Sequence, residues 1–128
     1  MQKIQMIFTM ISLTFLPFIS TACMAQETRH TGGPYYFESF ANYKIPFWPI
    51  KKLSEDEAKT RDAYYIAYYD KDGKIVSFTK YLYGKMEFDD KYFYGADGRI
   101  ERRELSKSTG ETAIQYFDKN GKLIPGEK

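Results

Sequence analysis

Three segments of this chain share one pattern: paired aromatic residues, a four-residue turn that ends in glycine, a basic residue and an aliphatic residue. The segments run from Tyr68 to Ile75, from Phe93 to Ile100 and from Tyr116 to Leu123. Asp-Gly or Asn-Gly closes each turn, and such a dipeptide between strand-forming residues is a strong local signal for a β-hairpin. The turn glycines are 25 and 23 residues apart, a spacing that fits one hairpin per unit. The pattern therefore predicts repeated antiparallel hairpins.

Strand-forming residues fill the intervals between these turns and two further glycine turns, at residues 84–85 and 107–110. Aromatic side chains make up 18% of the chain, and they favour pleated, half-buried surfaces. The expected strands are residues 63–69, 74–83, 86–94, 99–106, 111–117 and 122–124. We therefore expect a mainly β fold of the α+β class, a single antiparallel β-meander of about six strands. One face of such a sheet carries the core and the other stays available.

A capping box precedes the first expected strand. Ser54 can accept a hydrogen bond from the amide of Glu57, whose carboxylate can reach back to the amide of Ser54. Three acidic residues occupy the first turn, where the helix dipole favours them, and Glu55 and Lys59 form an i, i+4 pair. The sequence predicts one short helix from Ser54 to about Asp62, at the start of a globular domain that extends to the C-terminus (residues 54–128).

Two segments of different composition precede that domain. Residues 26–33 are polar and contain two glycines, which is typical of a flexible leader. Residues 34–53 form an aromatic and proline-rich segment, in which Pro46 and Pro49 exclude a helix and a central strand. We expect an extended strap that lies on the domain. Trp48 either packs against the sheet or stays exposed as a binding anchor.

The N-terminus has the features of an export signal. Lys3 precedes an apolar run over residues 4–19 that is too short for a bilayer-spanning helix, and small residues follow it. We therefore expect residues 1–25 to be a signal peptide and the protein to be exported, periplasmic or secreted. Cleavage after Ala25 would release a free domain. The stretch that ends at Cys23 also resembles a bacterial lipobox, and a lipid on Cys23 would anchor the protein to a membrane.

Composition excludes several kinds of chemistry. The formal net charge is +2, with basic and acidic residues interspersed, so nothing indicates nucleic-acid binding. Cys23 is the single cysteine and His30 the single histidine, which leaves no disulfide, no Cys–His or Ser–His–Asp constellation and no usual zinc site. The segment from Asp70 begins like a calcium loop, but its twelfth position is Tyr81 rather than glutamate. We expect no metal and no cofactor.

The hairpin pattern, such as Tyr69-Asp70-Lys71-Asp72-Gly73-Lys74, resembles the YD repeat of bacterial surface proteins and toxins and the MORN-variant repeat of small bacterial proteins. The sequence after the export signal also resembles a family of short exported bacterial proteins of unknown function. The residues that carry this second resemblance are Pro49, the Ser54 capping box, Arg61, Tyr64-Tyr65, Tyr69-Asp70, Gly73 and Lys80-Tyr81-Leu82. It implies a bacterial protein with one domain, and no activity.

These observations favour a non-enzymatic binding module of the bacterial envelope. Its Tyr-rich β-surface would meet a protein or a glycan, because tyrosine offers a large contact area with a polar tip. The candidate binding residues are Trp48, Tyr81, Tyr83, Tyr92 and Tyr94. An immunity- or inhibitor-type protein is one form of this class. The alternatives are a small envelope hydrolase that uses paired carboxylates and a structural accessory protein.

The hairpin interpretation can be tested at Gly98. A turn of this kind needs a residue with positive φ, which glycine adopts without strain and valine does not. We expect Gly98→Val to lower the melting temperature of the domain, measured by circular dichroism. An unchanged melting temperature would contradict the predicted turn.

Overall fold

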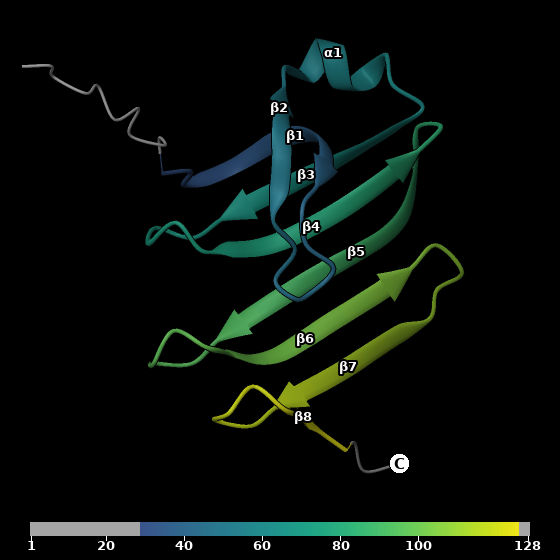
Figure 1. Ribbon diagram of the computed structural model, residues 1–128. Helices are drawn as coiled ribbons and strands as arrows, with labels where there is room; N and C mark the ends of the chain where they lie inside the picture. The colour runs from purple at the N-terminus through teal and green to yellow at the C-terminus, as the bar shows by residue number, and fades with distance from the viewer. Residues whose placement is uncertain (1–28, 126–128) are drawn as a thin grey trace, which may run out of the picture.

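The structure, a computed structural model, describes residues 29–125. The expected signal peptide, Cys23 and the start of the expected leader lie outside these residues. The described chain forms one open antiparallel sheet of eight strands with one short helix (Figure 1). The elements are β1 (Gly32–Phe40), β2 (Pro49–Leu53), α1 (Glu55–Lys59), β3 (Ala63–Tyr69), β4 (Ile75–Leu82), β5 (Lys85–Tyr94), β6 (Ile100–Lys107), β7 (Thr112–Phe117) and β8 (Leu123–Ile124). Their order across the sheet is β2-β1-β3-β4-β5-β6-β7-β8.

The mainly β, antiparallel fold is confirmed, but the predicted number of strands is wrong. The six expected strands are β3 to β8, which follow one another across the sheet as a meander. β1 and β2 are additional, and they come from residues assigned to the leader and the strap. Proline does not prevent either strand, because Pro34 lies beside an irregularity in the β1–β3 ladder and Pro49 is the first residue of the edge strand β2. At such positions the missing N–H costs no ladder hydrogen bond.

The turns of the hairpins share one hydrogen-bond pattern. In the first, the amide of Asp70 donates to the carbonyl of Lys74 at 2.8 Å, and Gly73 donates back to Asp70 at 3.1 Å. The Asp70 carboxylate also accepts hydrogen bonds from the amides of Asp72 and Lys74, each at 2.9 Å. The turns at residues 95–99 and 118–122 repeat the backbone bonds, and their glycines have φ values of 80° and 78°. All three turns lie at the same end of the sheet (Figure 1).

The helix α1 covers one face of the sheet. Ser54 caps it as predicted, with its hydroxyl accepting from the amide of Glu57 at 3.1 Å, but α1 ends at Lys59, a few residues before the predicted end. Ala58 points into a small core together with Leu53 and Tyr64. Since β2 and β3 both pair with β1, α1 crosses over β1 to join them. No helix within residues 29–125 is long and apolar enough to cross a membrane.

The larger core lies on the opposite face. Phe78, in the central strand β4, is completely buried. The loop of residues 41–48 passes over it and inserts Phe47, whose ring centroid lies 5.2 Å from that of Phe78. Phe40 and Tyr65 also pack on Phe78, at 5.8 and 5.1 Å. Figure 1 shows β2 and this loop in front of β3, β4 and β5. The expected strap therefore corresponds to this loop, while the residues on either side of it are strands.

Phe78 offers a test of this arrangement. Truncating a fully buried phenylalanine to alanine costs about 3–5 kcal/mol, so Phe78→Ala should remove much of the free energy of unfolding, measured by urea denaturation. Tyr43→Ala provides the control, because Tyr43 lies in the same loop as Phe47 and is 90% exposed. It should change the free energy by less than about 0.5 kcal/mol. Equal effects of the two variants would contradict the described core.

Candidate functional site

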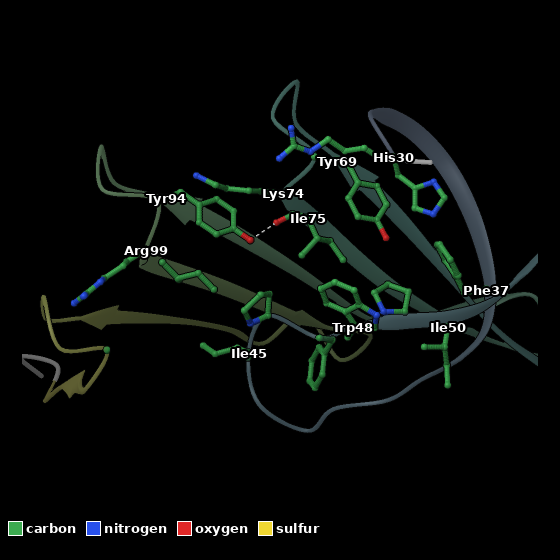
Figure 2. A pocket seen from close by; sticks show the side chains of 18 of the residues that line it. His30, Phe37, Ile45, Trp48, Ile50, Tyr69, Lys74, Ile75, Tyr94 and Arg99 are labelled. Carbon is green, nitrogen blue, oxygen red and sulfur yellow. Dashed lines mark hydrogen bonds between the residues drawn. The ribbon is translucent and has the colours of Figure 1, made fainter. Parts of the chain in front are cut away.

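A large groove lies between the loop of residues 41–48 and the core face of the sheet. Its volume is about 1350 Å³, and it extends from β1 and β2 across to β7. Figure 2 shows Ile45 and Trp48 on the loop side and Ile75 and Tyr94 on the sheet side. Its apolar lining consists of Phe37, Ile45, Pro46, Phe47, Trp48, Pro49, Ile50, Ile75, Ile100 and Phe117. The twist of the sheet and the loop together form this concave surface.

Two tyrosines add polar groups to the apolar floor. The Tyr94 hydroxyl donates a hydrogen bond to the carbonyl of Ile75 at 2.6 Å, and burial raises the pKa of Tyr94 well above its usual range. Burial also raises the pKa of Tyr69, to about 12. Figure 2 shows the Tyr69 hydroxyl pointing into the groove. The Tyr94 proton is already donated to Ile75, so towards a ligand its hydroxyl can only accept a hydrogen bond.

The rim of the groove is basic. Its charged lining residues are Arg29, Lys51, Lys52, Lys74 and Arg99, and His30 joins them. Within residues 29–125, no aspartate or glutamate lines this groove. The His30 ring lies 5.2 Å from that of Tyr69, so it belongs to the aromatic wall as well as to the rim. The groove thus combines an apolar, aromatic floor with positive charge.

Two of these cations rest on the glycine turns. The Lys74 Nζ lies 5.4 Å from the centroid of the Tyr94 ring, and a Cβ atom placed on Gly98 would be 2.9 Å from it. The side chain of Arg29 lies in the same way against Gly73, where a Cβ atom would be 2.5 Å from its Cγ. A residue larger than glycine at Gly73 or Gly98 would therefore displace one of these cations.

The predicted binding residues do not form one site. Trp48, which is 62% exposed, and Tyr94 both line the groove. Tyr92 is only 2% exposed, beneath Phe47, so it offers no surface to a partner. Tyr81 lies on the opposite face and stacks on Tyr64, with ring centroids 5.3 Å apart. Tyr83 is 73% exposed, but it lies in the β4–β5 turn, at the end of the sheet away from the three hairpin turns.

The basic rim was missed by sequence reasoning, although the signal was present. A basic residue follows each turn glycine, as Lys74, Arg99 and Lys122. Read as part of the turn pattern, these residues indicate only solvated hairpin ends. That Lys74 and Arg99 face a groove depends on the curvature of the sheet and on the loop of residues 41–48, which no local pattern predicts.

A buried polar network under the loop was also missed. Asp90 is completely buried and accepts two hydrogen bonds from Arg103, at 2.7 and 2.8 Å. The Tyr92 hydroxyl donates to Asp90 at 2.8 Å and accepts from the amide of Phe47 at 3.4 Å. Burial alone would lower the pKa of Arg103, but its hydrogen bonds to Asp90 and the charge of that carboxylate raise it. Alternate residues of a strand share a face, and this places Asp90 on the face of β5 that lies beside the buried Phe78. That alternation was the signal available in the sequence.

The other carboxylates are dispersed. Glu87 lines a smaller groove of about 320 Å³ beside Phe47 and pairs with Lys80 at 2.7 Å. Asp89 accepts a hydrogen bond from Thr79 at 2.8 Å on the opposite face. Among the described residues there is no group of three His, Cys, Asp or Glu side chains that could hold a metal ion. The arrangement favours binding through aromatic and basic groups.

The buried network should be important for stability. Removing one partner of a buried ion pair costs about 3–5 kcal/mol, whereas replacing both by apolar residues is often neutral. We expect Asp90→Asn to lower the free energy of unfolding by about 3 kcal/mol, and Asp90→Leu with Arg103→Met to recover most of the loss, both in urea denaturation. Asp97→Asn, in an exposed pair, is the control. A double variant as unstable as Asp90→Asn would contradict this role.

Comparison with known proteins gives one result. A family of unknown function, DUF6156, matches residues 29–126, which include all of the described chain. No curated protein and no solved structure matches the chain. The match agrees with the resemblance to a family of unknown function, while the type of repeat stays a prediction. The chain belongs to the family of unknown function DUF6156.

Proposed function

We propose that this protein is a non-enzymatic binding module of the bacterial envelope, and that its ligand lies in the groove between the loop of residues 41–48 and the sheet. One observation carries the proposal. The groove has an aromatic and aliphatic floor and a basic rim, with no acidic residue of the described chain in its lining. Concave sites of this composition are the usual places where proteins bind ligands.

The size of the groove favours an extended ligand. A volume of about 1350 Å³ exceeds the roughly 300–1,000 Å³ that is typical of sites for small molecules. Trp48 lies in the loop that forms one side of the groove, and it is 62% exposed. A large aromatic residue left open to solvent is a common binding anchor. A segment of a protein or of a glycan fits these features.

The export signal supports a ligand of the envelope. Residues 1–25 lie outside the described chain, and their role rests on the order of a basic residue, an apolar run and small residues. A lipid attached at Cys23 would hold the groove close to a membrane, whereas cleavage after Ala25 would release the domain from it. The alternative of a carboxylate-dependent hydrolase has less support, because no pair of Asp or Glu side chains among the described residues lines the groove.

The proposal can be tested with the full chain. We would recover the tagged protein from its producing cells after crosslinking and quantify the material attached to it. The variants are Trp48→Ala, in the groove, and Tyr83→Ala, which removes an aromatic residue of even greater exposure at the other end of the sheet. Since central tryptophans commonly contribute 2 kcal/mol or more to binding, Trp48→Ala should retain less than about a tenth of the material.

Tyr83→Ala should retain as much material as the unchanged protein, and both variants should keep its melting temperature. If Tyr83→Ala loses the material and Trp48→Ala does not, the groove is not the binding site. If the unchanged protein carries no more material than an unrelated exported protein, the binding function itself is wrong.

A further inference from the structure

We propose that the ligand is a linear acidic polysaccharide, which lies across the strands with its acidic groups along the cations at the hairpin-turn end of the groove. This inference rests on the proposed binding function and adds the chemical class of the ligand. The cations are Arg29, Lys74 and Arg99, and all three line the groove.

These three cations follow the hairpins. The turns at residues 70–74, 95–99 and 118–122 lie at one end of the sheet, and each is two strands from the next. Two inter-strand spacings amount to about 9–10 Å. Arg29 lies against Gly73, in the first turn, and Lys74 lies against Gly98, in the second. Arg99 directly follows Gly98, so the rim presents positive charge at two successive turns, and a polymer that carries a negative charge on successive units complements it.

The aspartates of the same turns lie outside the lining of the groove, and one of them, Asp97, pairs with Arg99. Asp70 and Asp118 each accept two hydrogen bonds from backbone amides of their own turns, at 2.8 to 2.9 Å. Asp97 accepts from the amide of Arg99 at 3.0 Å, and its carboxylate lies 3.9 Å from the Arg99 side chain. None of the three lines the groove. Lys74 forms no ion pair with another of residues 29–125 and rests on the Tyr94 ring.

The backbone around the groove argues against a peptide that binds by adding a strand to the sheet. An extended peptide binds a sheet through the N–H and C=O groups of a free strand edge. The floor strands β3 to β6 are paired on both sides, so their backbone groups are already used. The edge strand beside the groove is β2, where Pro49 has no N–H and Lys51 has a φ of 58°, which interrupts an extended ladder. Recognition must therefore depend on side chains.

The side chains of the groove suit sugar rings. Trp48, Tyr69 and Tyr94 supply aromatic rings with a polar atom at one end, which pack against apolar ring faces and hydrogen-bond to hydroxyl groups. A lipid would place one charged headgroup at one point of the groove and would leave most of its cations without a ligand group. A chain of sugars with repeated carboxylates uses both the rings and the cations.

Ligand binding can be followed by tryptophan fluorescence, because Trp48 is the single tryptophan of the chain and lines the groove. We would titrate the full-length protein with oligomers of polygalacturonate and follow Trp48 fluorescence. We expect a saturable change and an affinity that weakens as salt rises. Lys74→Gln with Arg99→Gln should weaken binding roughly three- to thirtyfold. The control is Lys71→Gln, in the same turn as Lys74 but outside the groove lining, and its affinity should stay within about twofold.

Three further probes give outcomes that would overturn the inference. Equal affinity for fully methyl-esterified polygalacturonate, or no effect of Lys74→Gln with Arg99→Gln, would remove the role of charge. Tighter binding of poly-L-glutamate would favour an acidic peptide, and a response to dodecanoate without a response to polygalacturonate would favour a lipid. In each of these cases the groove still binds a ligand, so the proposed function stands or falls by its own Trp48→Ala experiment. A melting temperature close to that of the unchanged protein would show that the variants fold.

Discussion

The packing of Phe47 on the sheet is the contact on which the rest of this molecule depends. A single sheet has two faces, and α1 covers part of one of them. The other face has the loop of residues 41–48, which places Phe47 on the buried ring of Phe78 at 5.2 Å. Without this contact the centre of β4 would be open to water, and the groove would lose its outer wall. Core and binding site are therefore built from the same loop.

Polar groups hold that loop in place from below. The amide of Phe47 donates to the Tyr92 hydroxyl, which donates to Asp90, and Arg103 neutralises Asp90 with two hydrogen bonds. A buried carboxylate is costly unless it is paired and fully hydrogen-bonded. Here the pairing joins β5, β6 and the loop, so the register of two strands and the position of the loop depend on one another.

The groove and its charges come from two different levels of organisation. A basic residue follows the glycine of each of the three turns, directly before the next strand begins. The curvature of the sheet then brings Lys74 and Arg99 to the same concave surface as Trp48. If the protein binds an acidic glycan as proposed, the same turns serve two purposes. Their glycines close the hairpins, and their basic residues contact the ligand.

What the sequence by itself determined is the local structure. The five turns of the meander, six of the eight strands and the Ser54 cap were predictable from local sequence. The hydrogen bonds that close a turn such as Asp70–Gly73 and the cap at Ser54 join residues three or four positions apart, and strand-forming residues fill the intervals between the turns. Trp48 and Tyr94, two of the expected binding residues, line the groove, but the same reasoning also selected the buried Tyr92 and the distant Tyr81 and Tyr83. Only the tertiary structure decided that β1 and β2 join the sheet, that Asp90 meets Arg103 and that a basic groove exists. These features depend on contacts between residues far apart in the chain, and their energies come from burial, which no local pattern contains.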